Sequence, residues 1–159
     1  MGEGTMIAIR RIPHTATWPI RQTAMWPGKP LEFVRVEGDE RAVHYGLFED
    51  DHLLAVISCF YRQGEMQFRK FATLPHHQRR GFGTMLLRHV INEASREGVP
   101  RLWCNARADK QVFYAKFGLR ATGDQFAREG VAYVTMELKL GDEMPASTSM
   151  AATLTRPVN

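Results

Sequence analysis

Short stretches of alternating apolar and polar residues recur along the chain, and this period of two is typical of half-buried β-strands. We expect strands at residues 6–11, 42–49, 52–61, 66–73, 101–106 and 131–140, a strand or extended loop at 119–126, and a short strand within 30–36. The acidic turn at 49–51 joins two of these strands as a hairpin. Within 66–73, Lys70 interrupts the apolar row, which indicates strain or functional exposure at that end.

Helical spacing replaces this alternation after residue 79. Five apolar residues fall on one stripe, as in an amphipathic helix: Leu86, Leu87, Val90, Ile91 and Ala94. Gly98 and Pro100 then end this helix. Two further helices are expected, one that begins at an N-cap Thr15 and one at 109–117 that Gly118 closes.

The length of 159 residues, with 44% hydrophobic and 24% charged residues, is that of a single globular domain. We assign residues 1–140 to this domain and expect the small, polar, Pro-containing segment 141–159 to be a disordered tail. No apolar run approaches the roughly 18–20 residues of a membrane span, and the N-terminus lacks the apolar core of a signal peptide. Cytoplasmic residence without membrane association is therefore expected.

The cysteines and the net charge exclude only some classes of ligand and partner. Cys59 and Cys104 lie in apolar strand-like runs, which favours buried reduced thiols, and no Cys/His spacing resembles a zinc site. The net charge of +4 is compatible with nucleic acid, a polyanionic cofactor or simply a solvated basic surface. No metal is expected, and the charge alone does not choose a partner.

The segment from Gln78 to Thr84, QRRGFGT, is the strongest candidate for a binding loop. Glycines at a helix entry leave main-chain N–H groups unpaired beside the positive end of the helix dipole, and the two arginines add charge. Such a group of donors suits a pyrophosphate. The Gly-Lys-Ser/Thr of a Walker loop and the third glycine of a dinucleotide fingerprint are both missing. The loop therefore belongs to another kind of anion site.

QRRGFG follows Thr73-Leu74-Pro75 and precedes VFYAKFGL, and together these motifs resemble the Q/R-x-x-G-x-G/A signature and the tyrosine-bearing helix of the GCN5-related N-acetyltransferase (GNAT) superfamily. The resemblance extends over residues 6–140. Within the superfamily, the chain is similar to small bacterial members whose acceptors are uncharacterised. It implies an α/β (α+β) single-domain fold, in which about four helices flank a twisted mixed sheet of about six to seven strands. That sheet would splay between the strands at 68–73 and 101–106.

The resemblance implies acetyl-CoA (coenzyme A) as co-substrate and no metal. The pantetheine arm would take main-chain hydrogen bonds from 71–73, and the pyrophosphate would lie on the N–H groups of 79–84. The residues that would contact the cofactor are Phe71, Ala72, Thr73, Gln78, Arg79, Arg80, Gly81, Phe82, Gly83, Thr84, Asn105 and Tyr114.

Tyr114 is the residue that the resemblance places in the chemistry, because a phenol can protonate or hydrogen-bond the departing thiolate. The general base is open, since Gln67 stands where many family members carry glutamate, and glutamine cannot accept a proton. Three residues are candidates for this role, directly or through water: His44, Glu32 and Tyr133. Among them His44 is our predicted catalytic partner of Tyr114, with a purely structural strand histidine as the alternative interpretation.

Arg21, Arg69 and Tyr133 are expected to line the acceptor pocket, where the two arginines would favour a carboxylate or phosphate on the acceptor. The leading hypothesis is acetyl transfer from acetyl-CoA to a primary amine, on a small molecule or an amino terminus, by direct attack in a ternary complex. The alternative is a non-catalytic acyl-CoA-binding sensor or scaffold. A third reading, a nucleic-acid-binding domain, lacks a recognition helix or an aromatic RNA platform, so no nucleic acid is expected. A homodimer, common in the superfamily, is also considered.

Overall fold

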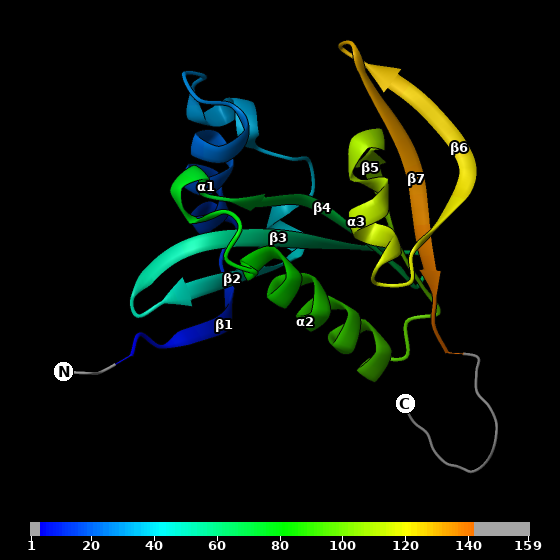
Figure 1. Cartoon of the computed structure of the whole chain (residues 1–159), viewed down its shortest axis with the longest axis horizontal. Helices are drawn as coiled ribbons and strands as arrows, with labels where there is room; N and C mark the ends of the chain where they lie inside the picture. The colour runs from blue at the N-terminus through cyan, green and yellow to red at the C-terminus, as the bar shows by residue number, and fades with distance from the viewer. Residues whose placement is uncertain (1–3, 142–159) are drawn as a thin grey trace. The chain divides into compact units, whose positions relative to one another are not determined.

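The computed structural model describes residues 4–141, so the predicted tail, apart from Gly141, lies outside the described residues. Seven strands form one sheet in the order β1-β2-β3-β4-β5-β7-β6 (Figure 1). The strands are β1 Ile7–Ile12, β2 Val43–Glu49, β3 His52–Arg62, β4 Glu65–Thr73, β5 Arg101–Arg107, β6 Arg120–Arg128 and β7 Val131–Lys139. The α-helices of the described residues are α1 His14–Met25, α2 Phe82–Arg96 and α3 Gln111–Ala115.

The sheet is mixed, as predicted. β4 and β5 pair in parallel, whereas β1–β2, β2–β3, β5–β7 and β6–β7 pair antiparallel. Within the described residues the chain divides into two compact units, the first made of 4–60 and 68–90 and the second of 61–67 and 91–141. The predicted splay between residues 68–73 and β5 concerns both units and stays a prediction.

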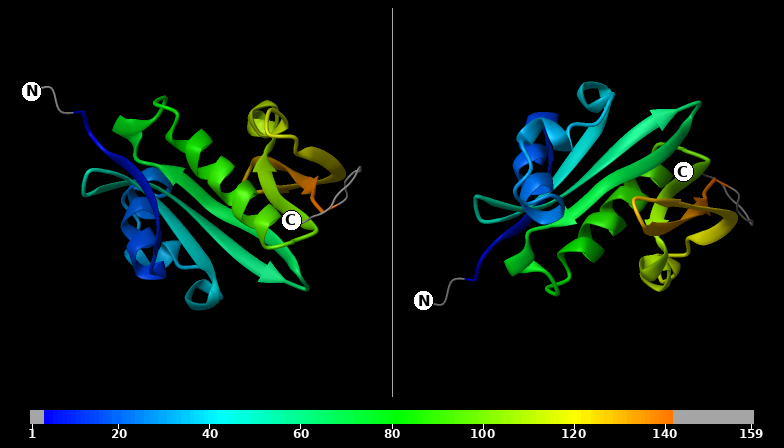
Figure 2. Two further views of the ribbon diagram at one scale, coloured as in Figure 1. Left: turned by 90° about the horizontal axis from the view of Figure 1, so that it is seen from below. Right: turned by 90° about the horizontal axis from the view of Figure 1, so that it is seen from above.

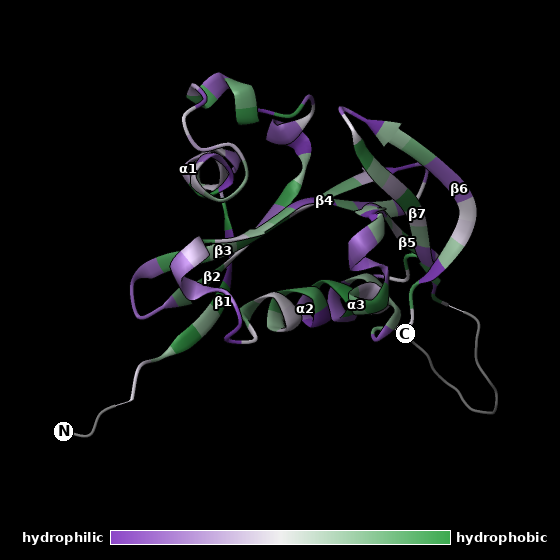
Figure 3. Cartoon of the chain, turned by 45° about the horizontal axis from the view of Figure 1, so that its top comes forward, coloured by the Kyte–Doolittle hydropathy of each residue, from purple (hydrophilic) through white to green (hydrophobic). Residues whose placement is uncertain are grey.

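The first unit is a layered structure built on the predicted β2–β3 hairpin. In all three views α1 and the first turns of α2 lie on opposite faces of its strands (Figures 1, 2 and 3). Leu47, Val56 and Ile57 of the hairpin are fully buried, and so are Leu86 and Leu87 of α2. Burial of each such side chain contributes about 1.5–3 kcal/mol, so the hairpin and the helix stabilise each other.

Helix α2 follows the predicted stripe closely. Along the helix the hydropathy colours alternate between apolar and polar residues, as an amphipathic helix requires (Figure 3). Gly98, with φ of 78°, ends the helix, and the Val99 N–H donates to the Ala94 carbonyl at 3.0 Å. This is the hydrogen-bond pattern of a glycine C-cap, so the predicted end of the helix is confirmed.

Two predictions in the first unit are wrong in detail. Helix α1 begins at His14, after an N-cap Pro13, and the Thr17 hydroxyl donates to the His14 carbonyl at 2.6 Å. Residues 30–36 contain no strand: a 3-10 helix, η1 Leu31–Val34, takes its place, because local bonds such as Phe33 N–H to the Pro30 carbonyl at 3.0 Å already satisfy the main chain. In a strand, these main-chain groups would instead need hydrogen-bond partners on a neighbouring strand.

The second unit contains the remaining strands and α3. The ladder between β5 and β7 runs from Arg101/Lys139 to Arg107/Tyr133. The helix predicted at 109–117 is shorter than expected, because a 3-10 turn, η4 Ala108–Lys110, precedes α3. Gly118, with φ of 96°, ends this segment as predicted.

Candidate active site

The predicted anion loop follows the end of β4 in the first unit. After Thr73 the chain forms a 3-10 turn, η3 Pro75–His77, and α2 begins at Phe82. Arg79 and Gly81 have left-handed backbones, with φ of 67° and 84°. Left-handed residues in a turn gather successive N–H groups into a concavity that can hold an anion. Gln78 braces the loop by donating from Nε2 to the Thr73 carbonyl at 3.2 Å.

The two glycines of the loop have different tasks. A Cβ at Gly83 would lie 3.3 Å from Cζ of Phe71, so the absence of a side chain lets this ring pack against the start of α2. A Cβ at Gly81 would meet no atom within 4 Å, so the space beside this residue is open. Gly83 therefore serves packing, whereas Gly81 supplies the left-handed turn and leaves room for a ligand.

Lys70 is a strained residue inside β4. Its φ of 53° is unusual for a residue with a side chain, and it agrees with strain, one of the two interpretations of the interrupted apolar row. Lys70 immediately precedes 71–73, the segment predicted to bind the pantetheine arm. Because backbone strain concentrates at functional sites, this observation supports a role for the end of β4.

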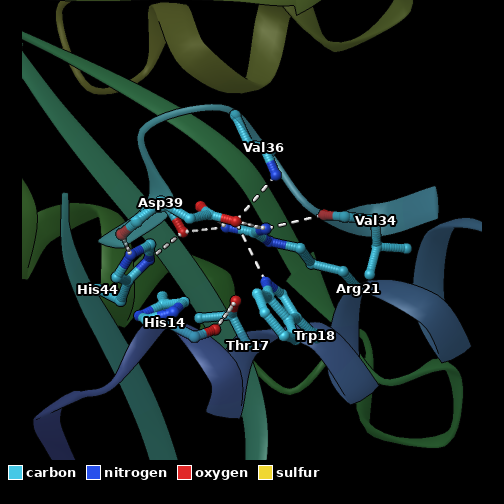
Figure 4. Close-up of polar contacts among 9 residues, drawn as sticks. His14, Thr17, Trp18, Arg21, Val34, Val36, Asp39 and His44 are labelled. Carbon is cyan, nitrogen blue, oxygen red and sulfur yellow. Dashed lines mark hydrogen bonds and ion pairs between the residues drawn. The ribbon is translucent and has the colours of Figure 1, made fainter. Parts of the chain in front are cut away.

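A buried polar network in the first unit connects α1, the segment 31–41 and the strands β2 and β3 (Figure 4). Arg21 donates from Nη1 and Nη2 to the two carboxylate oxygens of Asp39, at 2.9 and 3.0 Å. Asp39 also accepts from the Val36 N–H at 2.9 Å and from Trp18 Nε1 at 3.1 Å. Burial by itself raises the pKa of Asp39, but the hydrogen bonds from Arg21, Val36 and Trp18 outweigh it and lower the pKa.

His44 belongs to the same network. Its Nε2 is 2.8 Å from the Asp39 carbonyl oxygen, and its Nδ1 is 2.7 Å from Ser58 Oγ. A carbonyl only accepts, so Nε2 carries the proton and Nδ1 accepts from the Ser58 hydroxyl. That hydroxyl in turn accepts from Arg21 Nη2 at 2.9 Å. Burial lowers the pKa of His44, and the ring is therefore neutral at pH 7.

These contacts do not agree with the roles predicted for Arg21 and His44. The Arg21 side chain has no exposed surface and its charge is balanced by Asp39, so it offers no cation to an acceptor. Both ring nitrogens of His44 have protein partners and the side chain is buried, so neither is placed to take a proton from an acceptor. Both residues instead fasten the segment 31–41 to α1 and to the sheet.

In the second unit, Tyr114 lies in α3 beside Cys104 of β5. Burial, with a smaller effect of the Cys104 thiol, raises the pKa of Tyr114 well above its usual value. Burial also raises the pKa of Cys104, to about 12. The phenol keeps its proton at neutral pH, so it can donate a proton or hydrogen bond but cannot act as a base. This property suits the role that we predicted for Tyr114.

Asn105 and Tyr133 share one face of the second unit. The Thr135 hydroxyl donates to Asn105 Oδ1 at 2.8 Å across the β5–β7 pair. Tyr133 stacks on Phe126 of β6, with ring centroids 5.2 Å apart and planes at 12°. Because side chains alternate along a strand, Cys104 points to the opposite face. Asn105 and Tyr133 thus lie on the same face of the β5–β7 pair, with Tyr133 two residues along β7 from the partner of Asn105.

The other candidates lie in the first unit. The Arg69 guanidinium lies 5.5 Å over the Phe60 ring, and Glu32 is exposed in η1. Both cysteines are buried and unbridged, as predicted. Residues 4–141 contain no cluster of three His, Cys, Asp or Glu side chains suited to a metal ion. None of the helices in this range has the length and apolar character needed to span a membrane.

Comparison with known proteins agrees with this geometry. A family model for the acetyltransferase (GNAT) domain matches residues 30–140. The chain is 28% identical over 136 residues to the uncharacterised N-acetyltransferase YitI of Bacillus subtilis, covering 79% of this chain and 91% of that protein. It is 34% identical over 103 residues to the ribosomal protein bS18-alanine N-acetyltransferase of Salmonella typhimurium, covering 64% of this chain and 69% of that protein.

Among solved structures, a GNAT family acetyltransferase from Elizabethkingia anophelis with acetyl-CoA bound matches with a TM-score of 0.63 at 18% identity, over 84% of this chain and 98% of that chain. A mixed sheet whose β4 leads through a glycine-containing loop into α2 is the arrangement expected of a GNAT-type acyltransferase. The chain belongs to the GNAT acetyltransferase family. Its members use acetyl-CoA as the acetyl donor.

Two interactions at or near the site were not predicted. No role was predicted for Asp39, and Glu49 was predicted only as part of a hairpin turn, yet each binds an arginine far away in sequence. The acidic character of both positions was visible. Their arginine partners were not, since a sequence pattern does not show which distant charges come into contact.

Proposed function

We propose that the protein transfers the acetyl group of acetyl-CoA to a primary amine and that an α-amino group of a protein or peptide is the acceptor it suits best. The proposal is carried by the state of the candidate bases. Gln67 cannot accept a proton, and the ring nitrogens of His44 are occupied by Ser58 and Asp39. If neither Gln67 nor His44 takes the proton, the reaction favours an amine that loses its proton easily.

The pKa of the acceptor decides between amine classes. A lysine amine, with a pKa near 10.4, needs about 4–5 kcal/mol to lose its proton at pH 7, whereas an α-amino group near pKa 8 needs only about 1–1.5 kcal/mol. The relative from Salmonella is named for the acetylation of an alanine of ribosomal protein bS18. This name supports an amino-terminal acceptor for the present chain, but it does not indicate that ribosomal protein bS18 is that acceptor.

The chain's residues have distinct tasks in this scheme. Bound acetyl-CoA supplies an activated thioester. The N–H groups and arginines of 78–84 would hold its pyrophosphate, and the main chain of 71–73 would hold its pantetheine arm. The acceptor nitrogen forms a bond to the acetyl carbon as the carbon–sulfur bond breaks. Tyr114 donates its phenol proton to the departing sulfur, and the surplus proton of the amine passes through water to restore the phenol.

A thiol-release assay tests the proposal. One arm uses a peptide with a free N-terminal alanine, and the other uses the same peptide with a blocked N-terminus and an internal lysine. We expect turnover with the first and little with the second. If calorimetry detects CoA binding but no amine in a broad panel is acetylated, the proposal fails and the sensor alternative is favoured.

The role of Tyr114 is tested by Tyr114→Phe, which removes only the hydroxyl. We expect kcat to fall by about 10²-fold or more with an unchanged Kd for CoA, because the proton donor is lost while the ring still packs. Tyr61→Phe is the matched control, since that phenol is exposed and donates to Glu97 at 2.8 Å. An unchanged kcat in Tyr114→Phe would exclude the acid role.

A further inference from the structure

The two arginines of the anion loop are held differently. Arg80 forms a two-pronged ion pair with Glu49, the last residue of β2: Nη2 lies 2.6 Å from Oε2 and Nη1 lies 3.2 Å from Oε1. No ion pair of Arg79 is present among residues 4–141. The side chain of Glu49 is only 17% exposed, although that of Arg80 is 43% exposed. The carboxylate is therefore a fixed part of the surface beside the loop.

Further contacts hold the guanidinium and its partner in place. Arg80 Nη1 lies 3.1 Å from Nδ1 of His77, and the guanidinium carbon lies 4.6 Å from the centre of the Phe82 ring. Thr5 donates from its hydroxyl to Glu49 Oε2 at 3.1 Å. The hydrogen bond from Arg80 lowers the pKa of Glu49, so the carboxylate stays charged.

The donor count shows what this arrangement leaves available. A guanidinium has five N–H bonds. The two carboxylate oxygens of Glu49 occupy one N–H on Nη1 and one on Nη2, and His77 occupies the other N–H on Nη1. Two N–H bonds remain, on Nε and Nη2, and they point in the same direction from one edge of the plane. Neither has a protein partner within residues 4–141. Such an edge matches two oxygens of a phosphate.

We propose that Glu49 is a positioning residue for cofactor binding: it holds one edge of Arg80 so that the Nε/Nη2 edge is presented to a phosphate group at the anion loop. This inference rests on the proposed use of the loop for acetyl-CoA. An acidic side chain beside an anion site would repel the ligand if it were unpaired. Paired with Arg80, it restricts an otherwise flexible cation to one orientation, which lessens the entropy lost on binding.

The test is a double-mutant cycle on CoA binding, measured by calorimetry. Glu49→Gln should weaken CoA binding by roughly two- to fivefold, the size expected of an exposed ion pair. In an Arg80→Ala background, Glu49→Gln should cause no further weakening, because the residue it acts through is gone. Glu40→Gln is the matched control, since Glu40 pairs only with its exposed neighbour Arg41. Its CoA affinity should equal that of the wild type.

The outcomes separate the possible failures. Equal CoA binding by Glu49→Gln would overturn the positioning role, and tighter binding would overturn it and identify Glu49 as a competitor of the phosphate. Equal weakening in both backgrounds would also overturn it, because the effect would then be a general structural one. If the wild type itself binds no CoA, the proposed function fails, and thermal unfolding of each variant shows whether a loss reflects folding.

Discussion

The buried pair Arg21–Asp39 makes the most demanding prediction about stability. Asp39→Asn keeps the shape of the side chain but removes its charge and replaces one acceptor oxygen with a donor. The wild-type carboxylate accepts four hydrogen bonds, two from Arg21, one from the Val36 N–H and one from Trp18 Nε1. The substitution leaves the Arg21 guanidinium charged and without exposed surface.

The expected loss follows from that uncompensated charge. Breaking a buried ion pair by removing one partner lowers the free energy of unfolding by about 3–5 kcal/mol. Because small domains have only about 5–15 kcal/mol in total, Asp39→Asn should be close to unfolding at 37 °C. Urea titrations followed by tryptophan fluorescence measure the loss, since Trp18 itself contacts Asp39.

Two further variants test whether charge is the cause. Glu40→Gln changes the next residue, whose ion pair with Arg41 is exposed, and should alter stability by less than about 0.5 kcal/mol. Arg21→Met combined with Asp39→Asn removes the orphaned charge, so the double variant should lose less than the sum of the single losses, by at least about 1 kcal/mol. A loss below about 1 kcal/mol in Asp39→Asn, or strictly additive effects, would refute the reasoning.

Three other predictions concern the network, the loop and the thiols. Burial lowers the pKa of His44 below 6.5, so at mildly acidic pH the unfolded chain takes up a proton that the folded protein does not. The free energy of unfolding should therefore fall as the pH drops from 7 to 5, by up to about 1.4 kcal/mol per pH unit. His44→Gln should remove this part of the pH dependence in urea titrations. The pKa of Asp39 is lowered from 3.8, so its own contribution is lost only at more acidic pH. Gly81→Ala and Gly28→Ala, with wild-type φ of 84° and 87°, should each lower stability by about 1–2 kcal/mol, yet only Gly81→Ala should weaken CoA binding in calorimetry. Cys59 and Cys104 are buried, so iodoacetamide at pH 7.5 should label neither in the folded protein and both in urea, as mass spectrometry would show; labelling without urea would contradict their burial.

Local patterns were sufficient for the elements that lead into the site. The β2–β3 hairpin, the stripe and glycine end of α2, and the loop at 78–84 were all predicted, because each depends on residues close together in the chain. Strain at Lys70 was one of two interpretations of the interrupted apolar row. The loop could be predicted as an anion site for the same reason: its donors, glycines and cations are consecutive.

The tertiary structure decided which charges remain available. In the sequence, Arg21 and Arg80 are both basic residues near predicted functional segments, and nothing local distinguishes them. In the structure, Arg21 forms a buried ion pair with Asp39, 18 positions away. Arg80 pairs with Glu49, 31 positions away, and one edge of its guanidinium remains available. His44 was likewise predicted as a candidate base, but in the structure its ring is buried and both ring nitrogens are hydrogen-bonded. Periodicity reports which side of an element faces the core, but pairing between distant side chains depends on how the elements pack.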